Sequence, residues 1–95
     1  MAIRLIVTLQ AAPGKGTEFA EAFKPQMEIT LGEEGCEQYE LFRSITDPDK
    51  LVLLERWTGQ ELLDKHLEAL RARGPSPTAS LRAEGSTPTM ERFEV

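Results

Sequence analysis

Apolar side chains alternate with other residues along the first segment, 2–10. The face that we expect to be buried carries only branched aliphatic side chains: Ile3, Leu5, Val7 and Leu9. A period of two residues is typical of a strand with one buried face. Segments 36–44 and 50–57 have the same period, and Thr46-Asp47-Pro48-Asp49 between them has the composition of a hairpin loop. The pattern therefore predicts three strands, the second and third joined as a hairpin.

Two further segments repeat apolar residues at the spacing of an α-helix. The stripe of the first helix consists of Phe19, Phe23, Met27 and Leu31, flanked by Ala20 and Ala22. We predict that Thr17 caps this helix, that Pro25 kinks it without ending it, and that Gly32 and Gly35 follow its end. The stripe of the second helix consists of Leu62, Leu63, His66, Leu67 and Leu70, after a capping box at Thr58 and Glu61. The only histidine of the chain is therefore expected on the buried side of a helix.

The end of the chain adds one more strand to this order. Residues 74–77 read Gly-Pro-Ser-Pro and break the second helix, residues 78–86 fit a short helical turn, and residues 89–95 alternate as an edge strand. Strand, helix, strand, strand, helix, strand is the order of the ferredoxin-like split βαβ sandwich, an α+β fold. We expect one domain over residues 1–95, with the first and third strands at the centre of the sheet.

In such a fold both helices cover one face of the sheet and leave the other face bare. Ile6 and one apolar row of the third strand would then face water. Covering this surface with the sheet of a second copy contributes roughly 25 cal/mol per Å² of apolar area. The sequence therefore predicts a homodimer joined through its sheets.

Charge and cysteine content exclude several classes of partner. The net charge is -5, and no basic cluster stands out, so neither nucleic acid nor an anionic membrane is an expected partner. The longest apolar runs have four residues, and residues 1–10 lack the features of a signal peptide. Cys36 is the only cysteine, which excludes an internal disulfide and suits the cytoplasm. One histidine and one cysteine thirty residues apart do not form a metal-binding motif, and we expect no metal site.

Several short motifs occur together at characteristic spacings. They are Glu34-Gly35-Cys36, Tyr39-Glu40-Leu41, Arg43-Ser44, Asp47-Pro48, Glu55-Arg56-Trp57 and Leu63-Asp64-Lys65-His66-Leu67. In this combination the chain resembles the antibiotic biosynthesis monooxygenase domain family, over about residues 2 to 71. The resemblance implies a dimeric α+β barrel and an oxygenase of quinols, anthrones or similar polycyclic aromatics that uses dioxygen and no cofactor. Relatives with the same fold degrade haem or process small signalling molecules, so the resemblance does not define the reaction.

Four side chains are candidates for this chemistry. His66 is the candidate base, because an imidazole accepts a proton near neutral pH. Trp57 is a candidate to stack on a substrate ring. The hydroxyl of Tyr39 is a candidate to form a hydrogen bond with a carbonyl or phenolic oxygen. Arg43, on the same strand face as Tyr39, is a candidate to stabilise an oxyanion.

Each candidate also has a purely structural interpretation. His66 would be a hydrogen-bonded core residue, Trp57 and Tyr39 would pack on the sheet, and Arg43 would pair with Glu40, Glu55 or Asp47 at the surface. Two other functions remain open on the same fold: an isomerase of a small carbonyl compound with His66 as proton shuttle, and a dimeric module that binds hydrophobic ligands without catalysis. Arg71 favours the binding module, because it stands where many members of the family have a second histidine.

Overall fold

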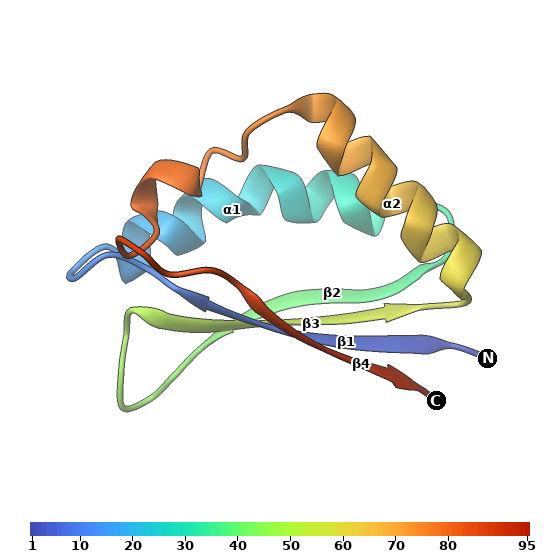
Figure 1. The fold of residues 1–95 in the computed structure, drawn as a ribbon, viewed down its shortest axis with the longest axis horizontal. Helices are drawn as coiled ribbons and strands as arrows, with labels where there is room; N and C mark the ends of the chain where they lie inside the picture. The colour runs from blue at the N-terminus through green and yellow to red at the C-terminus, as the bar shows by residue number, and fades with distance from the viewer.

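A computed structural model describes residues 1–95 of the protein. The elements follow in the order β1 (Ile3–Gln10), α1 (Gly16–Leu31), β2 (Cys36–Arg43), β3 (Lys50–Trp57), α2 (Gln60–Arg73), a 3₁₀ turn η1 (Ala79–Leu81) and β4 (Thr89–Glu94). The strands form one antiparallel sheet in the order β2-β3-β1-β4, which places β1 and β3 at its centre as predicted. Figure 1 shows both helices on one face of the sheet and no helix on the other. The α+β ferredoxin-like prediction is confirmed.

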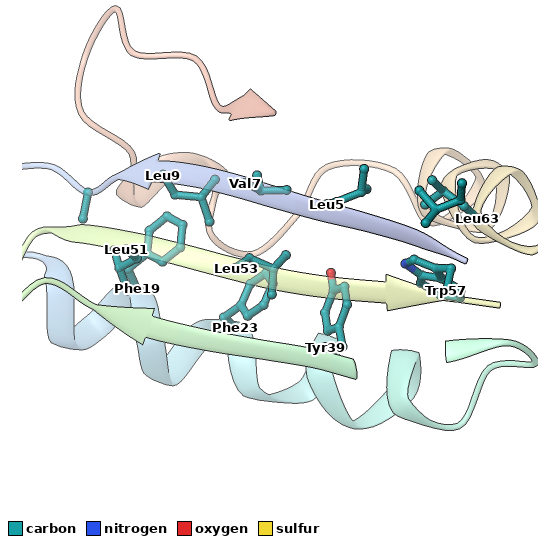
Figure 2. Packing of buried hydrophobic residues seen from close by; sticks show 12 residues of the cluster. Leu5, Val7, Leu9, Phe19, Phe23, Tyr39, Leu51, Leu53, Trp57 and Leu63 are labelled. Atoms are coloured by element: carbon teal, nitrogen blue, oxygen red, sulfur yellow. The ribbon is translucent and has the colours of Figure 1, made fainter. Parts of the chain in front are cut away.

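The core lies between the helices and one face of the two central strands. Exposure alternates along β1 and β3 with a period of two, as the hydrophobic pattern predicted. The register places Leu5 opposite Glu55 and Leu9 opposite Leu51. Figure 2 shows the aromatic rings of this core in a row along the sheet: Phe19, Phe23, Tyr39 and Trp57. A single acidic residue, Glu55, therefore interrupts the otherwise apolar inner face of β3.

Helix α1 buries a different last residue from the one we predicted. Leu31 is 53% exposed, whereas Thr30 is completely buried. At about 100° per residue, Leu31 lies about 120° around the helix from Phe19, but Thr30 lies only about 20° from it. A spacing of four residues drifts off the buried face after three steps, and the polar residue takes the last core position. Pro25 is exposed and the helix continues through it, so it does not end the helix, as predicted.

The predicted side-chain caps of both helices were wrong. Helix α1 begins at Gly16, before Thr17. Asp49 accepts hydrogen bonds from the backbone N–H of Gly16, the first residue of the helix, and from that of Gly14, two residues before it, each at 2.9 Å. Helix α2 begins after Gly59, whose backbone is extended and provides no side chain. Asp49, in the loop between β2 and β3, thus bonds the first amide of α1, which has no side-chain cap from its own segment.

The end of the chain follows the prediction. Residues 79–81 form η1, and β4 pairs with β1 at the edge of the sheet. The uncovered sheet face carries five apolar side chains: Ile6, Phe42, Val52, Leu54 and Phe93. Neither helix has the length and hydropathy needed to cross a membrane.

Candidate functional site

A cavity of about 500 Å³ lies between the sheet and the helices. Its lining is largely apolar and includes Phe19 and Phe23 from α1, Val7 from β1 and Leu53 from β3. The chain between α2 and β4 contributes Pro75, Pro77, Thr78, Arg82 and Pro88. Three polar side chains of the core, Tyr39, Glu55 and His66, also line it. A cavity of this volume is in the range of small-molecule binding sites.

His66 is held on the buried side of α2, as its helical stripe predicted. The residue is 3% exposed, and its ring centroid lies 4.7 Å from that of Trp57 and 5.6 Å from that of Tyr39. Its Nδ1 lies 2.5 Å from Oε1 of Glu33, while no hydrogen bond within the chain involves its Nε2. A carboxylate only accepts, so the neutral ring carries its proton on Nδ1 and keeps the basic lone pair on Nε2.

Glu33 is a site residue that the sequence analysis missed. It lies in the turn between α1 and β2, and this turn is pressed against α2 at Gly35. A Cβ added to Gly35 would overlap Cδ1 of Leu62, so no larger residue fits there without displacement. This close approach brings Glu33 to His66, and its second oxygen accepts a hydrogen bond from Arg73 at 3.3 Å. The pairing spans thirty-three residues of sequence, and no local motif indicates it.

Glu55 is the second residue that was missed, although the alternation of β3 placed it on the inner face. It is 5% exposed, and its Oε1 accepts a hydrogen bond of 2.9 Å from the indole N–H of Trp57. Burial raises the pKa of Glu55 above its ordinary value, while the indole hydrogen bond and the imidazole of His66 act in the opposite direction. A buried carboxyl with a raised pKa on a cavity wall is a candidate acid or base.

Tyr39 presents its hydroxyl at the same end of the cavity. The residue is 1% exposed, it stacks on Phe23 with ring centroids 5.9 Å apart, and its hydroxyl accepts a hydrogen bond of 2.9 Å from Gln26. Burial and, next in importance, the Glu55 carboxylate raise the pKa of the Tyr39 phenol well above its usual value. The hydroxyl therefore stays protonated and can donate a hydrogen bond to an oxygen in the cavity.

Trp57 and Arg43 do not line the cavity. Trp57 is completely buried and packs against the ring of His66 on the core side, so it supports the imidazole instead of offering a free face. Arg43 lies on the surface, where it donates to the carbonyl of Pro48 at 3.0 Å and to the Thr17 hydroxyl at 3.2 Å. The surface ion pair expected for Arg43 is also absent. The structure thus brings together three of the four predicted residues, and separates Arg43 from them.

The remaining reactive groups contribute little to this site. Cys36 is half-buried, and burial, followed by the nearby Glu55 and Glu33 carboxylates, raises the pKa of its thiol. A thiol with a raised pKa is a poor nucleophile at neutral pH. No three His, Cys, Asp or Glu side chains converge in the geometry of a metal-binding group.

The arrangement combines an apolar chamber with one polar end. An aromatic wall runs from Phe19 to Phe23, whose centroids are 6.5 Å apart, and on through Tyr39 to His66. Such a wall suits a flat aromatic molecule, and the polar end offers a ring nitrogen for a proton and a phenol for a hydrogen bond. The apolar walls also limit access of water to a reactive intermediate that lies against them.

Comparison with known proteins agrees with this geometry. The chain is 27% identical over 66 residues, 70% of each chain, to the protein of Bacillus subtilis (strain 168) named "Putative monooxygenase YcnE". A conserved protein from Methanosarcina mazei Go1 has the same fold with a TM-score of 0.84 and 29% identity, covering 98% of this chain and 91% of that one. A Caulobacter crescentus CB15 protein named "putative antibiotic biosynthesis monooxygenase" superposes with a TM-score of 0.80 and 25% identity, over 99% of this chain and 89% of that one.

The sequence profile of one family matches residues 2–73, which include β1, α1, β2, β3 and α2. This range contains His66, Glu55 and Tyr39, which line the cavity, and Glu33, which is bonded to His66. The chain belongs to the antibiotic biosynthesis monooxygenase family.

Proposed function

We propose that the protein is a cofactor-independent monooxygenase that oxidises a quinol, an anthrone or a related phenolic polycyclic compound with dioxygen. The observation that carries this proposal is the aromatic wall of the cavity, which leads to the ring of His66. Membership of the family supports the reaction class. The cavity supports a flat, largely apolar substrate, because most of the surface that faces it is apolar.

In this reaction the substrate supplies all the reducing power. Removal of a proton from the enol or phenol form gives an electron-rich anion, which passes an electron to dioxygen. When an anthrone methylene becomes a carbonyl, the carbon loses two hydrogens and gains one oxygen atom. The second oxygen atom leaves with the two hydrogens as water, so atoms and electrons balance without another reductant.

The side chains divide this work in the following way. His66 takes the proton on Nε2, and Glu33 holds the ring by its Nδ1 and stabilises the imidazolium that forms. Glu55 provides a second carboxylate near the imidazolium, and Trp57 supports the ring from the core. Tyr39 donates to the substrate oxygen. An oxyanion role for Arg43 has no support in this geometry.

Oxygen uptake with a panel of hydroquinones and anthrones tests the proposal. The wild-type chain, dialysed against chelator and without added flavin, should consume oxygen with at least one of them. His66→Ala should lower the rate by about 10²-fold or more, which is the usual contribution of a general base. The matched control is Lys65→Ala, the adjacent exposed residue of α2, which should leave the rate unchanged.

The outcomes separate the proposal from its alternatives. Turnover of a substrate without oxygen uptake would indicate an isomerase. Binding of the same compounds without any turnover, and with equal affinity in the His66→Ala variant, would indicate a ligand-binding module. Either result would refute the monooxygenase proposal.

We also propose that two copies pair through the uncovered sheet faces. Phe42 is 46% exposed and Phe93 44% exposed on this face, beside the half-buried Leu54. Leu54→Glu places a charge at the centre of the surface and should convert a dimer to a monomer in sedimentation analysis. Leu31→Glu is the matched control, because Leu31 is 53% exposed on α1, which covers the opposite face of the sheet. A wild-type chain that sediments as a monomer at micromolar concentration would refute the dimer.

A further inference from the structure

Arg82 is one of the residues that line the cavity. Arg82 is half-buried, and its side chain forms neither a hydrogen bond nor an ion pair within the chain. Arg73, the other arginine of the cavity lining, is already paired with Glu33. A guanidinium has five N–H donors, and partial removal from water without an acceptor costs free energy. The guanidinium of Arg82 is therefore free to bind an acceptor that enters the cavity.

The backbone of Arg82 is fixed at the end of β1. Arg82 forms an isolated antiparallel bridge with Ala11, and the residues on either side of it complete the connection. The N–H of Ala83 donates to the carbonyl of Gln10 at 2.9 Å, and the N–H of Ala12 donates to the carbonyl of Leu81 at 2.8 Å. In Figure 1 the segment after α2 crosses above the sheet to reach this end of the molecule. Two hydrogen bonds of its neighbours thus fix the backbone around Arg82 to the end of β1 and the residues that follow it.

Arg82 and the polar end occupy opposite ends of the cavity. Leu5 pairs with Glu55, which in turn pairs with Tyr39 on the next strand. Ala11, the partner of Arg82, comes six residues after Leu5, a distance of about 20 Å along the strand at roughly 3.3 Å per residue. Between the two ends the lining is made of apolar side chains such as Val7 and Leu53. Thr78, which is 5% exposed, adds a buried hydroxyl to the lining that is contributed by the Arg82 segment.

We propose that the cavity selects aromatic substrates that carry an anionic group, a carboxylate or sulfonate, which Arg82 binds at the end of the cavity away from His66. The anion would form the charge-assisted hydrogen bonds that the guanidinium lacks, with the apolar body of the molecule along the aromatic wall. This inference rests on the proposed function, because it takes the cavity as the substrate site. It adds the chemical class of the substrate and names the residue that binds the anionic group.

Two fluorescent probes with the same ring system isolate the anionic group. 1-Anilinonaphthalene-8-sulfonate carries a sulfonate, and N-phenyl-1-naphthylamine is the same body without it. Titration of the full chain with each probe gives Kd for the wild type, for Arg82→Gln and for Arg71→Gln. Arg71 is the matched control, because it also lacks a partner but is exposed and lies outside the cavity lining.

The expected result is a loss of affinity for the sulfonate probe alone, and only in the Arg82→Gln variant. Arg82→Gln should weaken binding of the sulfonate probe by about tenfold to a hundredfold, the range for charge-assisted hydrogen bonds. Binding of the uncharged probe should change by less than about twofold, which also shows that the variant is folded. Arg71→Gln should bind both probes like the wild type, and amide shifts of Thr78 and Ala83 should locate the sulfonate probe at this end of the cavity.

Other results overturn the inference in distinguishable ways. If the uncharged probe binds but the sulfonate probe binds equally to the wild type and to Arg82→Gln, the anionic subsite is refuted and the proposed function stands. If the sulfonate probe binds without shifting the two amides, the subsite is likewise refuted. If neither probe binds, the cavity is not a ligand site, and the inference fails together with the proposed function.

Discussion

Replacement of Glu55 by glutamine tests the buried carboxyl on the inner face of β3. The Glu55→Gln variant keeps the size of the side chain and an oxygen that accepts the indole hydrogen bond of Trp57, but it removes the negative charge. In the wild type the residue is only 5% exposed, and its carboxylate has one hydrogen-bond donor, the indole at 2.9 Å. Burial is the largest influence on this carboxyl and raises its pKa above the ordinary value of 4.5.

The direction of the pH effect follows from proton linkage. Because the pKa of Glu55 is higher in the folded chain, the folded chain binds the proton more tightly. The stability that this proton provides is complete below about pH 4.5 and is lost as the pH rises through the folded pKa. Glu55→Gln should therefore match the wild type at about pH 4 and be more stable than it at about pH 8. The size of this gain should be about 1 to 3 kcal/mol, the usual cost of a buried polar group that is incompletely hydrogen-bonded.

Urea denaturation at intervals between about pH 4 and pH 8 measures this difference. Glu68→Gln is the matched control, because Glu68 is exposed on α2 and its replacement changes the net charge by the same amount. The reasoning is refuted if the difference between Glu55→Gln and the wild type does not grow with pH beyond that of the control. If Glu55→Gln is less stable than the wild type at about pH 8, then interactions in the folded chain fully offset the cost of burying the ionised carboxylate.

Three further changes test the helix contacts around the site. Glu33→Ala should move the neutral His66 ring from the Nδ1–H to the Nε2–H tautomer in long-range ¹H–¹⁵N spectra, and an unchanged tautomer would contradict the assigned hydrogen bond. Thr30→Val should raise the free energy of unfolding by about 1 kcal/mol, because the buried Thr30 hydroxyl has no hydrogen-bond partner. A loss of stability in urea denaturation would contradict this and would indicate a hydrogen bond between Thr30 and the nearby Tyr39 phenol. Gly16→Ala should lower the free energy of unfolding by about 1–3 kcal/mol, because the new Cβ would overlap the carbonyl oxygen of Pro48. An increase in stability, as the helix propensity of alanine alone would give, would contradict this contact.

The fold could be predicted because its signals are local and periodic. The alternation of β1 and β3 depends only on side chains two residues apart, and the stripe of α2 placed His66 correctly on the buried side. The prediction for the buried face of α1 was wrong only at its last position, where the helical period places Thr30 on the buried side in place of Leu31.

The helix caps and the site depended on contacts between distant segments. Thr17 is a reasonable cap by sequence, but the helix already begins at Gly16, whose amide donates to the Asp49 carboxylate of the β2–β3 loop. Glu33 becomes a site residue only because Gly35 allows the turn to approach α2. Glu55 was visible in the pattern as an acidic residue on an inner face. A buried acidic position within an apolar strand is a signal for a site, since an isolated charge there is costly.

Labelling with ¹⁸O₂ tests the central claim most directly. A substrate that the wild-type chain turns over is oxidised under ¹⁸O₂ with no added metal or flavin, and the product is examined by mass spectrometry. The account predicts one ¹⁸O atom in each product molecule and the other in water. A product that carries no ¹⁸O, while the substrate is still converted, would contradict it.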